Sequence, residues 1–259
     1  MTIELAYCTW GLSGPDNDVL DRIAEQRIAW IDIRPGDFLH HASRRRMHEL
    51  GLRISCMGLS FGFPAHTALD NADRSERLTC VRTAEAAILR ADRLDIPTVY
   101  VVPGKDGSDE GLARYAESLT RIADHAADFD IRLCIEHFPG TALPAIAATL
   151  AFLRQVGHPN LYLLLDIGHA QMSHEDLPAA IADAGPLIGY VHLDDNDGQG
   201  DLHLALYDGI LTEPALRATF DALRRAGYSG RASLELHPDL PDPLDALRRS
   251  QAAALAAIE

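Results

Sequence analysis

The chain has 259 residues, of which 47% are hydrophobic, and its 23 basic against 38 acidic side chains leave a formal net charge of −15. This composition excludes a disordered chain, and the acidic excess would repel nucleic acid and anionic membranes. No stretch approaches the roughly 18 consecutive apolar residues of a membrane span.

Strand and helix patterns alternate along the first half of the chain. Short apolar runs that end at Gly, Pro or a polar residue predict strands, and longer segments that open on a capping residue predict helices. The predicted strands are 3–10, 29–34, 52–59 and 98–102. The predicted helices are 16–27, 38–50 with Gly51 after its end, a long one that Asp70 or Asn71 caps and that runs to about residue 94, and 108–128.

The second half repeats the alternation, with predicted strands 132–138, 161–166, 188–194 and 231–237 and predicted helices 143–156, 174–184, 212–226 and 243–258. Eight strand–helix units without a linker or a change of composition predict one α/β domain over residues 1–259, a single (β/α)₈ TIM barrel. A doubly wound sheet is the rival fold. It would place a glycine-rich fingerprint after the first strand, where this chain has Cys8-Thr9-Trp10-Gly11-Leu12.

Four of the predicted strands deliver an acidic or imidazole side chain at or near their carboxyl ends. The residues are Glu136, Asp166, His192 and Glu235, from strands five to eight. These strands are neighbours around half of a closed barrel, so their ends converge on one face. Three carboxylates and one imidazole suit one divalent metal ion, with Mn²⁺ favoured and Mg²⁺, Co²⁺ or Zn²⁺ as alternatives.

A metal ion that chelates two adjacent oxygens of a ketose acidifies the C–H beside the carbonyl and stabilises the resulting enediolate. Glu136 and Glu235 can flank such a substrate as an acid–base pair. The predicted activity is therefore isomerisation or epimerisation of a sugar, a sugar acid or a cyclitol-like compound. A lyase that expels water or a glycosidic group from the same enediolate is the alternative. A non-catalytic barrel subunit and an endonuclease-like phosphodiesterase rank below both.

Several motifs resemble those of the xylose isomerase-like barrel superfamily, in its sugar phosphate isomerase/epimerase branch. They are CIEHF with Glu136, DIGH with Asp166 and His169, VHLDDNDG with His192, the D-L-H of residues 201–203, and SLELHP with Glu235. The resemblance implies that the two glutamates serve both as metal ligands and as the acid–base pair. It also implies that His169 contacts a substrate oxygen.

The chain departs from the DNA-repair endonucleases of this superfamily, which hold three metal ions and need histidines at the ends of strands three and four. Strand three here ends in Cys56-Met57-Gly58-Leu59 and strand four in Val101-Val102-Pro103-Gly104. Asp201 and His203 resemble a pair that helps to hold the third metal ion in those enzymes. In this chain we expect the pair to orient the substrate or to order the loop.

The remaining predicted substrate contacts lie after strand ends. Trp10 and Phe61 would stack on a sugar face, while Lys105 and His237 would reach the mouth of the barrel. Arg34 ends strand two, where sugar epimerases of this kind often carry a carboxylate, and could pair with an acidic or hydroxyl-rich substrate. The loop after strand eight is acidic and lacks glycine, which argues against a phosphate group on the substrate.

The cellular setting follows from the cysteines and the N-terminal stretch. The four cysteines form no C-x-x-C pair, and the chain starts with a strand pattern without a basic segment. A reducing cytoplasm is therefore expected, with reduced thiols and no signal peptide. The expected partner is a small carbohydrate, with neither nucleic acid nor membrane, and a homodimer is left open.

Overall fold

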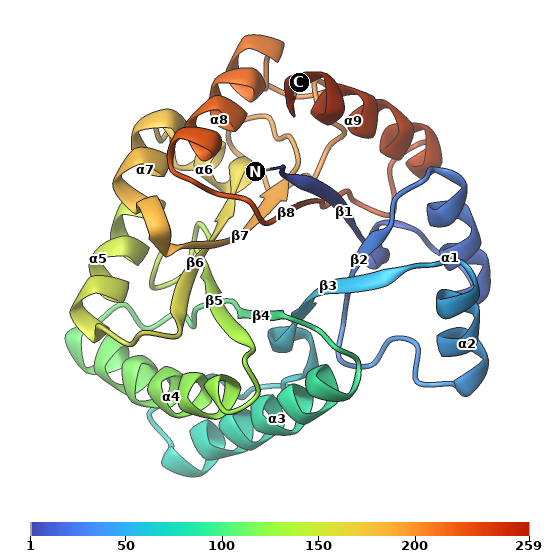
Figure 1. Ribbon diagram of the computed structural model, residues 1–259. Coiled ribbons are helices and arrows are strands. Elements are labelled where there is room, and N and C mark those ends of the chain that lie inside the picture. The colour runs from blue at the N-terminus through green and yellow to red at the C-terminus, as the bar shows by residue number, and fades with distance from the viewer. Residues whose placement is uncertain (1, 259) are drawn as a thin grey trace.

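Eight parallel strands close into a barrel in the computed structural model, which describes residues 2–258 (Figure 1). Each strand pairs with the next one in sequence, and β1 pairs with β8 to close the sheet. The strands are β1 (Glu4–Cys8), β2 (Trp30–Ile33), β3 (Arg53–Gly58), β4 (Thr98–Val101), β5 (Arg132–Glu136), β6 (Leu161–Asp166), β7 (Ile188–Leu193) and β8 (Arg231–Leu234). The predicted (β/α)₈ fold is confirmed.

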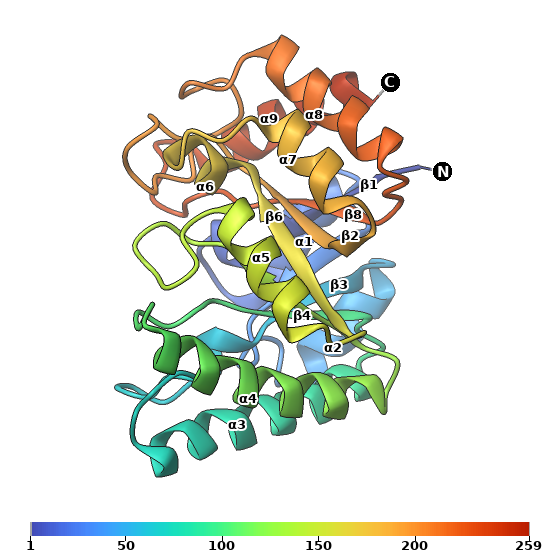
Figure 2. The ribbon, with the colours of Figure 1, turned by 90° about the vertical axis from the view of Figure 1, so that its left-hand side faces the viewer.

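Helices surround this barrel as an outer layer, which Figures 1 and 2 show from two directions. They are α1 (Asp16–Glu25), α2 (His41–Glu49), α3 (Arg74–Arg93), α4 (Asp109–Ala127), α5 (Ile146–Val156), α6 (Ile167–Met172), α7 (Leu177–Ala184), α8 (Glu213–Arg225) and α9 (Pro243–Ile258). Among the described residues, no helix is long and apolar enough to cross a membrane.

The start of α3 differs from the prediction. Asp73 is the N-cap, and its carboxylate accepts a hydrogen bond from the amide of Ser75 at 2.7 Å. Asp70, one of the two predicted caps, is instead buried and accepts a hydrogen bond from the amide of Asp106 at 3.0 Å. The prediction was wrong because several acidic and amide side chains in a row can each cap a helix, and the path of the loop selects one.

The segment after β6 also differs from the prediction. Residues Ile167–Met172 form the short helix α6, which the sequence did not predict, and the helix expected from residue 174 begins at Leu177 as α7. Asp166 caps α6, because its Oδ1 accepts a hydrogen bond from the amide of His169 at 2.8 Å. One carboxylate therefore both ends a strand and starts a helix, which fixes its orientation on the carboxyl face.

Candidate metal centre and substrate cavity

The four predicted ligands come together at the carboxyl end of the barrel. Glu136 ends β5, Asp166 ends β6, His192 lies in β7 beside Asp166, and Glu235 follows β8. All four side chains are buried. If one nitrogen or oxygen is taken from each of them, these four atoms all lie within 4.8 Å of one another. The parallel register of β5 to β8 produces this convergence, since equivalent strand ends meet at one face.

His192 sits at the centre of the cluster. Its Nδ1 lies 2.7 Å from Oε2 of Glu235, 3.3 Å from Oε1 of Glu136 and 3.8 Å from Oδ2 of Asp166. One imidazole nitrogen therefore faces three carboxylates. A metal ion among these groups would meet donors of the types that Mn²⁺, Mg²⁺ and Zn²⁺ accept.

The electrostatics of this cluster call for a cation. Burial, together with the neighbouring Asp194 carboxylate, raises the pKa of Asp166 well above its ordinary value. Oδ2 of Asp166 is buried and has no hydrogen-bond partner among residues 2–258. Burying ionised oxygens without a partner is costly, and a coordinated cation removes that cost. The residues present thus fit a divalent metal ion.

Burial opposes ionisation of Glu235, but the nearby imidazoles of His192 and His203 outweigh it and lower the pKa of Glu235 to about 2. The indole Nε1–H of Trp10 also donates a hydrogen bond to Oε1 of Glu235 at 3.0 Å. Glu235 is therefore held as an oriented carboxylate, the form that a base needs.

Asp32 lies behind His192 and was not singled out by the sequence. Its Oδ2 is 3.7 Å from Nε2 of His192, on the side of the ring away from the ligand cluster. Its Oδ1 accepts hydrogen bonds from the hydroxyls of Tyr190 at 2.6 Å and Ser55 at 2.5 Å. A carboxylate behind a ligating histidine orients the ring and sets its tautomer. The signal in the sequence is a single Asp within an otherwise apolar strand.

His169, Asp201 and His203 form a second polar cluster. Nε2 of His169 and Nε2 of His203 lie 3.3 and 3.1 Å from the same oxygen of Asp201. Burial opposes the charged form of His169, but the Asp166 and Asp201 carboxylates raise the pKa of His169 to about 10. The predicted pairing of Asp201 with His203 is present, and His169 joins it.

A cavity of about 380 Å³ opens beside both clusters. The predicted substrate contacts Trp10, Phe61, His169, Asp201, His203 and His237 line it, together with Glu136 and Glu235. Two aromatic rings form part of its wall, with the ring centroids of Trp10 and Phe61 5.1 Å apart. A mixed aromatic and polar wall of this kind suits a small polyhydroxylated molecule.

Lys105 and His137 lie outside this wall. Lys105 is exposed and lines a neighbouring cavity formed by the loops after β3 and β4, so the structure does not support it as a contact in the site cavity. His137 is buried, and its Nε2 accepts a hydrogen bond from the amide of Asp166 at 3.2 Å. This contact supports the metal cluster from behind, since alternation along the strand turns His137 away from the ligand face.

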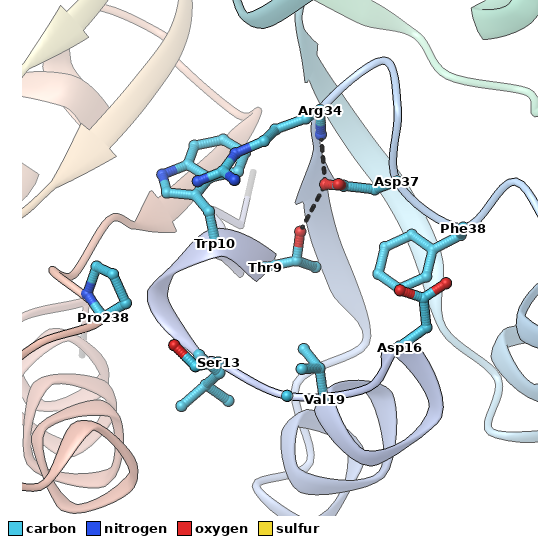
Figure 3. Close-up of a pocket in the computed structure, with 11 residues that line it drawn as sticks. Thr9, Trp10, Ser13, Asp16, Val19, Arg34, Asp37, Phe38 and Pro238 are labelled. Carbon is cyan, nitrogen blue, oxygen red and sulfur yellow. Dashed lines mark hydrogen bonds between the residues drawn. The ribbon is translucent and has the colours of Figure 1, made fainter.

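Arg34 separates the site cavity from a second one of about 360 Å³, which Figure 3 shows. Arg34, Trp10 and Pro238 line both cavities. The second cavity also carries the carboxylates of Asp16 and Asp37 (Figure 3). The sequence placed Arg34 at the end of strand two but could not show that it faces the substrate cavity.

Comparison with known proteins gives three informative matches. The family model described as the xylose isomerase-like TIM barrel matches residues 15–257. An L-ribulose 3-epimerase from Mesorhizobium japonicum is 25% identical over 246 residues, covering 87% of this chain and 78% of the relative. A putative hydroxypyruvate isomerase from Homo sapiens is 29% identical over 226 residues, covering 82% of this chain and 78% of the relative. The predicted isomerase or epimerase activity agrees with these names.

A solved structure has the same architecture. The crystal structure of a D-allulose 3-epimerase from Methylomonas sp. superposes with a TM-score of 0.84, covering 99% of this chain and 98% of that one. Its sequence identity is 19%, so the likeness shows the fold alone.

Proposed function

The chain belongs to the xylose isomerase-like TIM barrel family, as its motifs predicted, and we propose that it is a metal-dependent epimerase of ketose-type sugars. The observation that carries the proposal is the different exposure of the four ligands. Glu136 and Glu235 line the site cavity, whereas Asp166 and His192 are fully buried. Two of the ligands can therefore touch a substrate, and both are carboxylates.

The metal ion would be held by Glu136, Asp166, His192 and Glu235. When bound, a divalent ion polarises a carbonyl group and offsets the negative charge that develops on its oxygen. Asp32 and His137 keep the buried ligands oriented from behind. This arrangement supports one resident ion as a structural and chemical component of the site.

Proton transfer is the work of the two glutamates. They come from β5 and from the end of β8, with β6 and β7 between them, and both line the cavity. One glutamate removes a proton from the carbon beside the carbonyl. The other glutamate returns a proton to the opposite face, which inverts the configuration of that carbon. Trp10 orients Glu235 through its indole N–H, and the aromatic wall limits the access of water.

The hydroxyl groups of the sugar would meet His169, Asp201 and His203. Nδ1 of His169 lies 2.9 Å from the carbonyl oxygen of His137. The Nδ1–H donates to that carbonyl, so Nε2 is the nitrogen of His169 left to face the cavity. The ion-pair contacts of His169 and His203 with Asp201 hold these groups in place before a substrate arrives. They thereby position the carbon chain relative to the glutamates.

The test is proton exchange in D₂O. Protein refilled with Mn²⁺ is incubated with a panel of ketoses, and NMR follows deuterium at the carbon beside the carbonyl together with formation of the epimer. We expect deuterium incorporation and inversion of configuration at the same carbon. A dehydrated or cleaved product would identify a lyase instead, and the absence of exchange on every member of the panel would overturn the proposal.

A further inference from the structure

The guanidinium of Arg34 lies at the edge of the site cavity and forms no ion pair with a carboxylate among residues 2–258. No carboxylate among residues 2–258 lies within 4.0 Å of it, and its buried Nε has no hydrogen-bond partner there. The nearest acidic side chain in sequence, Asp37, instead accepts hydrogen bonds from the backbone amide of Arg34 at 2.8 Å and from the Thr9 hydroxyl at 3.5 Å. A half-buried guanidinium without a partner is unusual enough to require an explanation.

Two aromatic rings hold this guanidinium in place. Its central carbon lies 5.6 Å from the ring centroid of Trp10 and 5.0 Å from that of Phe61. Figure 3 shows the Arg34 side chain extending from the end of β2 to lie over the indole of Trp10. Such cation–π contacts occupy the flat face of the guanidinium and leave its N–H edge free. This edge can bind a carboxylate through two parallel hydrogen bonds.

The position of Arg34 relative to the reacting groups is set by Trp10. The same indole donates its N–H to Glu235 and packs against Arg34, so the proton-transfer site and the cation lie one indole ring apart. Arg34 is also the only Lys or Arg among the described residues that line the cavity, whose other charged groups are carboxylates and histidines. A neutral sugar would leave this cation unpaired.

We propose that Arg34 binds a carboxylate group of the substrate, so that the enzyme prefers ketoses whose far end is a carboxylate, that is, ketose-type sugar acids. The inference rests on the proposed function and adds the substrate class to it. The carbonyl end of such a molecule lies beside Glu136 and Glu235, and its carboxylate reaches Arg34. The net charge of −15 disfavours the approach of an anion, and the positive charge of Arg34 offsets this at the edge of the cavity.

A phosphate ester fits this position less well than a carboxylate. A phosphate dianion is usually held by several cationic or backbone N–H groups. Arg34 is the only Arg or Lys among the described residues that line the cavity, and the loop after β8 begins with Pro238 and Asp239, which offer no such group to an anion. Beyond Arg34, the carboxylates of Asp16 and Asp37 line the second cavity and would repel a larger anionic group. These charges limit the substrate to a small acid that ends at Arg34.

The experiment compares matched pairs that differ only in having a carboxylate in place of the terminal CH₂OH. Suitable pairs are L-sorbose with 5-keto-D-gluconate, D-fructose with D-fructuronate, and D-tagatose with D-tagaturonate. For Mn²⁺-loaded wild type we expect kcat/KM for exchange at the carbon beside the carbonyl to be about tenfold or more higher for the acid in at least one pair. In Arg34→Gln, the ratio of kcat/KM for the acid to kcat/KM for its neutral partner should fall about tenfold or more. Arg44→Gln removes an equal charge from an exposed position on α2 and should leave the ratio unchanged.

Binding measured by calorimetry on Mn²⁺-loaded Glu136→Gln gives a readout without turnover, and the acids should bind more tightly than their neutral partners only while Arg34 is present. Equal or better use of the neutral ketoses would overturn the inference and leave the proposed epimerase intact. Preference for D-fructose 6-phosphate over D-fructuronate would overturn it as well. The absence of exchange on all members of all pairs would instead count against the proposed function.

Discussion

The backbone amide of Gly168 donates a hydrogen bond to Oδ1 of Asp194 at 3.0 Å. This contact joins the two most recognisable motifs of the sequence, DIGH at the junction of β6 and α6 and HLDDNDG, which begins at the end of β7. A Cβ atom at position 168 would collide with both carboxylate oxygens of Asp194 and with the amide nitrogen of Asn196. The glycine in DIGH is thus required by the close approach of α6 to the Asp194 and Asn196 side chains after β7, at the barrel face that carries the candidate ligands.

Gly168→Ala should therefore destabilise the protein and disturb Asp194, whose Oδ2 lies 3.1 Å from Nδ1 of His203. Overpacking in a buried site costs about 1–3 kcal/mol of the free energy of unfolding. Urea unfolding measures the loss. Gly36→Ala is the control, because a Cβ there meets nothing within 4 Å. Equal stability of both variants would show that the loops yield freely around position 168.

Removal of divalent metal should lower the melting temperature. Without a cation, the buried Oδ2 of Asp166 has no hydrogen-bond partner among residues 2–258, and ion binding to the folded state adds stability that grows with ion concentration. Differential scanning fluorimetry on stripped protein, titrated with Mn²⁺, Mg²⁺, Co²⁺ and Zn²⁺, tests this. Asp166→Asn should weaken the response, whereas the exposed Asp18→Asn should keep it. A melting temperature indifferent to every ion would refute the metal centre.

Glu136→Gln and Glu235→Gln should each reduce kcat for epimerisation by about 10²–10⁴-fold, the usual contribution of a positioned acid or base. Each variant retains one of the two carboxylates that line the cavity. Exchange of the substrate proton with D₂O should therefore survive better than inversion in at least one of them. Metal content, measured on the same samples, separates loss of proton transfer from loss of the ion. Full activity in either variant would remove that residue from the mechanism.

Asp32→Asn should weaken metal binding by about 10–100-fold, since a carboxylate behind a ligating histidine supports its orientation. Asparagine would also present an NH₂ group or a weaker acceptor to Tyr190 and Ser55, at a cost of about 1–3 kcal/mol in the free energy of unfolding. Metal titration measures the metal affinity, and urea unfolding measures the free energy of unfolding. Ser55→Ala is the matched control, because it removes one donor to Asp32 and keeps the carboxylate, so its effect on metal affinity should be smaller. Identical metal affinities in Asp32→Asn and wild type would contradict the role.

Much of the fold and of the candidate metal-binding cluster followed from the sequence. Alternation of apolar strands with capped helices suffices to predict the barrel, and the parallel arrangement forces the ends of β5 to β8 onto one face. Glu136, Asp166, His192 and Glu235 therefore had to be neighbours, whatever the details of the loops. Local chemistry determined these features, because strand period and strand polarity are properties of short segments.

Other features depended on contacts between distant segments. Asp32 meets Tyr190 across 158 positions of the chain, and nothing local to either residue reveals that hydrogen bond. Lys105 and Arg34 both follow strands, yet the loop after β4 turns Lys105 into another cavity, and the rings of Trp10 and Phe61 draw Arg34 to the edge of the site. The sequence by itself determined which groups share the barrel face, because strand direction is encoded locally. Only the tertiary structure decided which loop cation faces the substrate, because that depends on long-range packing.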